Sequence, residues 1–344
     1  MGIKQDQVNL FLKNLELKSA DIYTAFIAAA DALTSTVALS QFADAFARGD
    51  IEAVIKILGL TDAALDPVAE AVRETFVLGA ASATNGLRPN SFGARILGRF
   101  SVRNLGAEQW LKDNGAERVT GYMQNLRDVL QDTMLSSMQK GTNPLKTARE
   151  LVGVLKKGDK YRKGGTLLLT RSRAATVAKV KEAFSSGDVE GLRHYLTLGE
   201  RDKRFDSIVK SAILKRTGLA ADKADQIIGY LADNYLKERA KAIAQTEALA
   251  ALNAGRAEAF RQATEAAGIN DSHIHREWSS TGDKKVRPDH QHLDGQKVVG
   301  INTPYRLPNG QPIMRPGDPK AGAKQVVRCR CMEYLEVDWF EGRA

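Results

Sequence analysis

The chain has 344 residues, of which 43% are hydrophobic and 26% are charged, and its net charge is +9. This size and composition exclude a chain that is disordered throughout, because enough apolar surface is present to bury one or more cores. No run approaches the roughly eighteen apolar residues of a membrane-spanning helix, and the N-terminus has neither a signal peptide nor a myristoylation motif, so we expect a cytoplasmic protein without a membrane anchor.

The first 90 residues (1–90) predict an acidic bundle of helices. Apolar residues such as Phe11 and Leu15 recur at steps of three and four, which is the period of an amphipathic helix. Residues 1–80 carry 6 Lys/Arg and 11 Asp/Glu, so this region is acidic within a basic chain. A stretch rich in Gly, Asn, Pro and Ser at 82–95 is typical of a linker to the next region.

Two segments of similar sequence, AFARGDIEAVIKILGL and AFSSGDVEGLRHYLTL, each predict a boundary between two helices. In both segments a glycine ends one helix and the aspartate that follows caps the next. The residues concerned are Gly49 with Asp50 and Gly187 with Asp188. The two segments are either a repeated helix–turn–helix unit or two cases of a common helix boundary.

Residues 91–268 predict a second helical region, and its segment 140–181 is strongly basic, with 12 Lys/Arg and 2 Asp/Glu. Such a density of positive charge attracts a polyanion without reading its sequence, because binding releases counterions from the phosphates. A run of charges is equally typical of a solvated helix face, and both interpretations stay open. The candidate nucleic-acid-binding residues are Lys156, Lys157, Lys160, Arg162, Lys163, Arg171 and Arg173.

The second region ends in a long predicted helix, 234–268. Ile243, Glu247, Ala250 and Ala254 lie on one face of this helix. Small alanine side chains allow a neighbouring backbone to approach closely. We therefore expect this face to pack against another element.

After residue 268 the composition changes, and residues 269–344 predict a small domain of short strands and turns. Six of the nine prolines lie between residues 288 and 319, and five glycines lie between 295 and 322. The β-prone runs QKVVGI and QVVRCRCMEYLEVDW lie among these turns. The expected fold class is α+β, with mostly α-helical N-terminal and central regions followed by a small Pro- and Gly-rich domain that contains strands.

Two short sequences in this domain, HQH and CRC, have the residue types of a zinc site. If each lies on a strand, His290 and His292 point to one side, and Cys329 and Cys331 do the same. Two imidazoles and two thiolates form a complete tetrahedral set for zinc, and a small domain with little core gains stability from such a crosslink. Two other interpretations stay open: His290 as a hydrogen-bonded turn residue, and the cysteines as small apolar core residues.

Several residues of the C-terminal half occur in the order found in one protein family. They are Thr246-Glu247 followed by Asn-x-Gly-Arg, then Trp278, Asp283, Arg287, His290, Leu293-Asp294-Gly295, a Gly/Pro turn region and the closing Cys329-Arg330-Cys331. Together these motifs resemble the phage Mu F-like head morphogenesis, or minor head, proteins. The resemblance covers about residues 100–340 and is closest from 236 onward. The family usually has Asn where this chain has Arg328.

The resemblance implies a virion protein of the phage head that is assembled in the host cytoplasm and acts near the portal vertex during head assembly and DNA packaging or ejection. The implied partners are the portal protein or the major capsid protein, packaged DNA, and further copies of the chain around the portal, without a membrane. Because His292 lies outside the family pattern, the resemblance favours His290, Cys329 and Cys331 as the core zinc ligands. The remaining ligand is then one of His292, His273, His275 or Asp294.

An enzyme is the competing class, because domains of this family are sometimes joined to toxin or effector regions. His290, Asp294 and Cys329 match a Cys–His–acid arrangement, and a zinc-activated water with Asp289 as base is a further option. The sequence has no Gly-x-Ser-x-Gly, no P-loop and no His-Glu-x-x-His. We therefore expect no catalytic residues, and a zinc- or Cys/His-dependent effector enzyme is the alternative.

Overall fold

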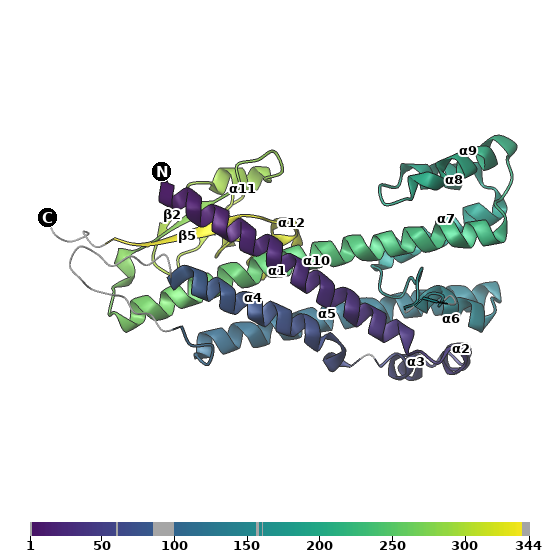
Figure 1. Ribbon diagram of the computed structural model, residues 1–344, viewed down its shortest axis with the longest axis horizontal. Helices are drawn as coiled ribbons and strands as arrows, with labels where there is room; N and C mark the ends of the chain where they lie inside the picture. The colour runs from purple at the N-terminus through teal and green to yellow at the C-terminus, as the bar shows by residue number, and fades with distance from the viewer. Residues whose placement is uncertain (1, 60, 85–99, 156–157, 160, 339–344) are drawn as a thin grey trace. The chain divides into compact units, whose positions relative to one another are not determined.

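The computed structural model describes residues 2–59, 61–84, 100–155, 158–159 and 161–338 (Figure 1). The chain forms two compact units: unit 1 consists of Met1–Ala25, Pro67–Ala116 and Lys241–Ala344, and unit 2 consists of Phe26–Asp66 and Glu117–Ala240. The expected α+β class is confirmed, because helices dominate and the strands are confined to the C-terminal region. The predicted domain boundaries at residues 90 and 268 stay a prediction, and most of the expected linker lies outside the described residues.

Helices are the main elements of the described chain as far as residue 266. They are α1 (Gly2–Ser35), α2 (Leu39–Ala47), α3 (Ile51–Ile57), α4 (Asp66–Thr84), α5 (Leu105–Lys140), α6 (Pro144–Val152), α7 (Arg171–Ser186), α8 (Val189–Thr197), α9 (Asp206–Lys215) and α10 (Ala221–Ala266), with 3₁₀ turns at Asp62–Leu65 and Lys203–Phe205. Among the described residues, no single helix is long and apolar enough to cross a membrane. One bent pair, Gln5–Ser35 with Leu39–Ala47, meets the length and composition criteria only when its two helices are taken together.

The Gly-Asp sequences end and begin helices as expected. Asp50 and Asp188 accept hydrogen bonds from backbone N–H groups in the first turns of α3 and α8. Gly49 and Gly187, which precede them, have φ angles of 72° and 78°. Glycine adopts this left-handed conformation without the steric cost of a Cβ atom, so the sequence determines both boundaries locally.

Unit 2 contains two apolar clusters. The first combines α2, α3 and α6 with the C-terminal part of α5, and includes the fully buried Phe42 and Leu130. The second combines α7, α8 and α9 with the N-terminal part of α10, and includes Phe184 and Tyr195, whose rings meet edge to face at 5.1 Å. The apolar faces of the amphipathic helices therefore pack against each other within this unit.

Unit 1 brings α4 and the C-terminal part of α10 into backbone contact. A Cβ atom on Gly255 would lie 2.0 Å from the carbonyl oxygen of Phe76, and one on Gly79 would lie 2.4 Å from that of Leu252. Only glycine fits at such a crossing. The α10 face that was expected to pack closely does so at Ala250, whose Cα atom would lie 2.9 Å from a Cβ atom on Gly317.

The C-terminal region of unit 1 is built on a three-stranded antiparallel sheet with the order β2-β1-β5. Its strands are β1 (Ile274–Ser279), β2 (Lys297–Val299) and β5 (Met332–Val337), and a separate hairpin pairs β3 (Tyr305–Arg306) with β4 (Pro312–Ile313). Two short helices, α11 (Pro288–Leu293) and α12 (Ala323–Val326), and 3₁₀ turns at Asp271–His273 and Pro319–Ala321 complete the region. Along β1 the side chains of Ile274, Arg276 and Trp278 are buried and alternate with partly exposed ones.

A buried charged network holds the turns of this region together. Arg276 and Glu333 are each 1% exposed and form an ion pair with an N–O distance of 2.9 Å. Arg276 also donates to the carbonyl oxygens of Gly300, Thr303 and Met314, so one guanidinium provides hydrogen bonds to three backbone carbonyls outside the sheet. Each buried charge thus has a partner of opposite sign, and the guanidinium connects the surrounding loops to the sheet.

Candidate metal centre

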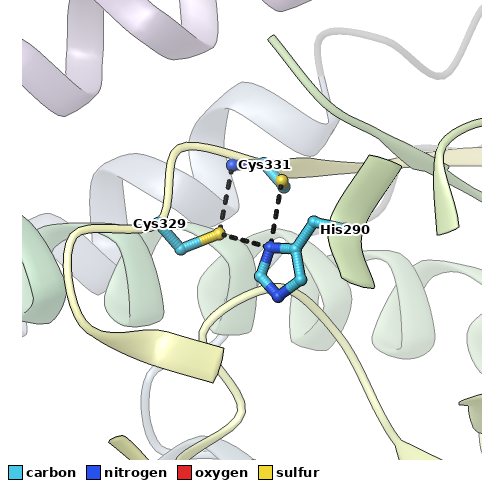
Figure 2. A group of neighbouring side chains, drawn as sticks. All are labelled: His290, Cys329 and Cys331. Atoms are coloured by element: carbon cyan, nitrogen blue, oxygen red, sulfur yellow. Dashed lines mark hydrogen bonds between the residues drawn. The ribbon is translucent and has the colours of Figure 1, made fainter. Parts of the chain in front are cut away.

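One imidazole and two thiols, 39 and 41 residues apart in the sequence, meet in unit 1 (Figure 2). Nδ1 of His290 lies 3.4 Å from Sγ of Cys329 and 3.6 Å from Sγ of Cys331. The three ligand atoms all lie within 4.8 Å of one another, and the residues are 1%, 2% and 3% exposed, respectively. We refer to His290, Cys329 and Cys331 as the His–Cys–Cys group. It unites the three residues that the resemblance favoured.

His290 lies on a short helix and not on a strand, so the expected geometry of HQH is wrong. Pro288 starts α11, because its fixed φ suits a first helical turn and its missing N–H is not needed there. Residues i and i+2 of a helix point about 200° apart. His290 is therefore buried against the thiols, whereas His292 is exposed and the structure does not bring it into the group.

The other candidates for a fourth ligand also lie elsewhere. Nδ1 of His273 lies 2.9 Å from the carbonyl oxygen of Asp338, and Asp294 accepts a hydrogen bond of 2.7 Å from the backbone N–H of Ser280. His275 is on β1, opposite Glu336 of β5. Among the described residues, no fourth His, Cys, Asp or Glu joins the His–Cys–Cys group.

The two cysteines lie in the segment directly before β5. Both sulfur atoms point at His290 (Figure 2). The residue between them, Arg330, pairs with Asp283 at 2.7 Å. This hydrogen bond is the main reason that the pKa of Asp283 falls to about 2. Arg287 donates to the carbonyl oxygen of Val327 just upstream. The family-motif residues Asp283, Arg287 and Arg330 therefore tie the loop before α11 to the cysteine segment.

The remaining motif residues place α11 against β1. Gly295 has a φ of 76°, and its N–H donates to the carbonyl oxygen of Trp278 at 2.8 Å. A left-handed residue is needed at this helix end, and glycine supplies it without strain. Trp278 is fully buried, and its ring meets that of His290 edge to face at 5.2 Å. The indole thus limits how the imidazole plane can rotate.

Helix α10 contributes to the group through residues of its family motif. Asn253 is 1% exposed, donates from Nδ2 to the carbonyl oxygen of Cys331 at 3.2 Å and accepts from the N–H of Glu333 at 3.3 Å. Thr246 accepts from the N–H of Arg328 at 3.1 Å, and the next residue, Glu247, is buried. The cysteine segment is therefore held along α10 at two points.

Two supporting residues were not expected from sequence reasoning, Gln325 and Asn253. Gln325 is 4% exposed, and its Oε1 lies 3.1 Å from Nε2 of His290. Asn253 lies in the Asn-x-Gly-Arg sequence that carried part of the resemblance, so a signal for it existed. A glutamine at position 325 has no comparable sequence signal.

The group favours one thiolate even before any metal binds. A hydrogen bond from the Cys331 thiol, assisted by the contact with His290, lowers the pKa of Cys329 well below its ordinary value, although burial acts in the opposite direction. The neighbouring Cys329 thiolate, together with burial, raises the pKa of Cys331. One imidazole nitrogen and two cysteine sulfurs at these distances are donors that Zn²⁺ prefers, and zinc would bind both cysteines as thiolates. The residues therefore fit a zinc ion.

Arg328, the residue before the cysteine motif, occupies a backbone conformation that suits another residue. Its φ is 55°, in the left-handed region, where the steric cost is lower for Asn and Gly than for other residues. An asparagine here, which the resemblance leads us to expect, would adopt this conformation at a lower steric cost.

Replacing Arg328 with Asn is therefore expected to raise the free energy of unfolding by about 0.5–1 kcal/mol. Urea denaturation of the purified protein measures this change. Arg328→Ala is the matched control, since it removes the side chain and keeps the conformational cost. If Arg328→Ala gains as much stability as Arg328→Asn, the side-chain contacts and not the backbone conformation are responsible.

The predicted nucleic-acid-binding residues are only partly described. Lys156, Lys157 and Lys160 lie outside the described residues. The other four have partners within unit 2: Arg171 pairs with Asp132 at 2.5 Å, Arg173 with Glu200 at 2.8 Å and Lys163 with Asp159 at 3.1 Å, and Arg162 donates to the carbonyl oxygen of Val37 at 3.4 Å. Contact with DNA stays a prediction.

Comparison with known proteins gives one family and one relative. The family model described as Phage Mu protein F like protein matches residues 128–333, more than half of the chain, and this range contains the whole His–Cys–Cys group. The uncharacterized protein YqbB of Bacillus subtilis (strain 168) is 31% identical over 104 residues, which is 30% of this chain and 32% of that protein. The chain thus covers about a third of that relative's length. No solved structure matches the chain.

Proposed function

Because the chain belongs to the phage Mu protein F-like family, a family of phage head morphogenesis proteins, we propose that it is a structural minor head protein of a tailed bacteriophage or prophage. We place its action at or near the portal, in head assembly and in DNA packaging or ejection. The observation that carries this proposal is the family match over residues 128–333, which includes the motif residues of the C-terminal region. The virion head is then its location.

The proposed role of the C-terminal region is to act as a rigid part of the head that is crosslinked by zinc. His290, Cys329 and Cys331 would hold the ion, and the ion would supply a link between α11 and the segment before β5. The three ligands are at most 3% exposed, which suits a structural ion. The few short strands of this region give it little core of its own, so such a link adds the stability that packing does not.

The proposed partners follow from the distribution of charge. Residues 1–80 carry 11 Asp/Glu against 6 Lys/Arg, and we propose that they dock on the portal protein or the major capsid protein. The basic segment 140–181 is the proposed site of non-specific contact with packaged DNA. Several copies around the portal would match the ring symmetry of that vertex.

The proposal predicts that the chain is present in purified heads at low copy number. A tagged chain expressed from its own phage or prophage should co-sediment with heads, and crosslinking should join it to portal protein more often than to a host cytoplasmic protein in the same lysate. Mass spectrometry of the gradient fractions measures both results. A chain that is abundant in the lysate and absent from purified heads would contradict the proposal.

A second candidate is a zinc-dependent effector enzyme carried on a head protein. The observation that favours it is the three-ligand group, because catalytic zinc keeps one position open for water or substrate. Against it, Asp289, the proposed base, accepts a hydrogen bond of 2.7 Å from Gln325. The two candidates differ in phage yield: Cys329→Ser should lower the yield of filled heads for a head protein and leave it unchanged for an effector.

A further inference from the structure

Gln325 lies behind His290, on the side of the imidazole opposite the thiols. Its side-chain oxygen, Oε1, lies 3.1 Å from Nε2 of His290. Its side-chain nitrogen, Nε2, donates to Oδ2 of Asp289 at 2.7 Å. Gln325 is 4% exposed and His290 is 1% exposed, so these contacts are shielded from water. Asp289, Gln325 and His290 thus form a continuous hydrogen-bonded chain that ends at the His–Cys–Cys group.

The carboxylate of Asp289 determines the direction of each hydrogen bond in this series. An ionised carboxylate only accepts hydrogen bonds, so the amide group of Gln325 must present its NH₂ to Asp289 and its oxygen to His290. An amide oxygen also only accepts, so Nε2 of His290 must carry the proton. In a neutral imidazole Nδ1 is then the unprotonated nitrogen. The lone pair that can bind a metal therefore points at the two sulfur atoms, 3.4 Å and 3.6 Å away.

We propose that Gln325, held in place by Asp289, is a positioning residue that makes His290 a metal ligand through Nδ1. The proposal rests on the metal binding of the proposed function and adds the residues that determine which nitrogen binds. A ligating histidine commonly donates its second N–H to an acceptor, which fixes the tautomer and the ring orientation. Here the acceptor is a neutral amide, and its own orientation depends on a carboxylate from the residue next to the ligand.

Among the described contacts of the imidazole, only the one with Gln325 favours the tautomer that leaves Nδ1 unprotonated, because a Cys329 thiolate would accept a hydrogen bond from a proton on Nδ1. The ring of Trp278 meets that of His290 edge to face, with an angle of 71° between the planes. That contact limits rotation of the ring but does not distinguish between the two nitrogens. Without Gln325, the proton could reside on Nδ1, and a metal ion would then have to displace it before binding.

The test is a zinc competition titration of the full-length chain with a chromophoric chelator. Gln325→Ala is expected to weaken zinc binding about 10- to 100-fold. Asp289→Ala is expected to weaken it in the same direction. Asp289→Asn should lie between the wild type and Asp289→Ala, because an asparagine amide can present either its oxygen or its NH₂ to Gln325 and no longer fixes the direction. The matched control is Gln291→Ala: Gln291 lies on the same helix as His290 and is exposed, and in the described contacts its side chain donates only to the carbonyl oxygen of Val286.

Long-range ¹H–¹⁵N NMR spectra of the zinc-loaded wild type provide a second readout that does not depend on how the variants fold. The expected spectrum shows His290 protonated at Nε2 and zinc-bound at Nδ1. Zinc at Nε2, or unchanged affinity in Gln325→Ala, overturns the positioning role while the zinc site itself stands. A wild type that binds no zinc overturns both this inference and the zinc part of the proposed function, so the two failures are distinguishable.

Discussion

Cys329→Ser is expected to abolish tight zinc binding and to destabilise the C-terminal region of unit 1. The substitution removes the sulfur whose pKa the group lowers most, and a serine hydroxyl is a poor replacement for a thiolate ligand. In free zinc about 1,000-fold above the Kd, the bound ion adds about 4 kcal/mol to the free energy of unfolding, and the variant loses this contribution. Elemental analysis gives the zinc content, and thermal unfolding with and without a chelator gives the stability.

Matched variants separate the ligand role from a general effect of substitution. His290→Ala should behave like Cys329→Ser, because its imidazole is 1% exposed and within 4.8 Å of both thiols. His292→Ala should keep its zinc and its stability, because that side chain is exposed on the other side of α11. A Cys329→Ser protein that retains one zinc ion per chain would contradict the proposed metal site. Loss of zinc in His292→Ala would show that the exposed histidine completes the coordination after all.

The residues of the candidate site were accessible from the sequence, but part of their geometry was not. The clustering of histidines, the CRC sequence and the family resemblance identified His290, Cys329 and Cys331. The strand expected at HQH is wrong, because Pro288 begins a helical turn. The local helix preference of this segment outweighed the i, i+2 spacing of the two histidines, which had suggested a strand. A proline followed by an acidic first-turn residue was the signal for that helix in the sequence.

Contacts between distant segments account for what the sequence did not predict. Gln325 supports His290 from 35 residues away, and a single glutamine has no pattern that reveals such a contact. Helix boundaries such as Gly49 and Asp50 were predictable because the capping interactions lie within a few residues. The crossing of α4 and α10 depends on Gly79 and Gly255, which are 176 positions apart and look locally unfavourable in helices. Their role becomes visible only when the two backbones are in contact.

Gly255→Ala is expected to lower the free energy of unfolding by about 3 kcal/mol or more. The new Cβ atom would lie 2.0 Å from the carbonyl oxygen of Phe76 and 3.0 Å from the backbone nitrogen of Ala80, so α4 must move away from α10. Alanine favours a helix over glycine by about 1 kcal/mol, and that gain is too small to compensate. The displacement would also weaken the long hydrogen bond from Arg256 to Ser82 of α4, which measures 3.4 Å. Urea denaturation gives the change in stability.

Gly121→Ala is the control that isolates this contact from helix propensity. Gly121 lies within α5, is exposed and has nothing within 4 Å of its ideal Cβ position, so alanine there should stabilise the protein by up to about 1 kcal/mol. Gly79→Ala, whose Cβ atom would lie 2.4 Å from the carbonyl oxygen of Leu252, opens the same crossing from the other helix. Once one of these substitutions has separated the helices, the second should cost much less than it does alone, so the double variant should be non-additive. If Gly255→Ala stabilises the protein as Gly121→Ala does, α4 and α10 are not in contact in solution.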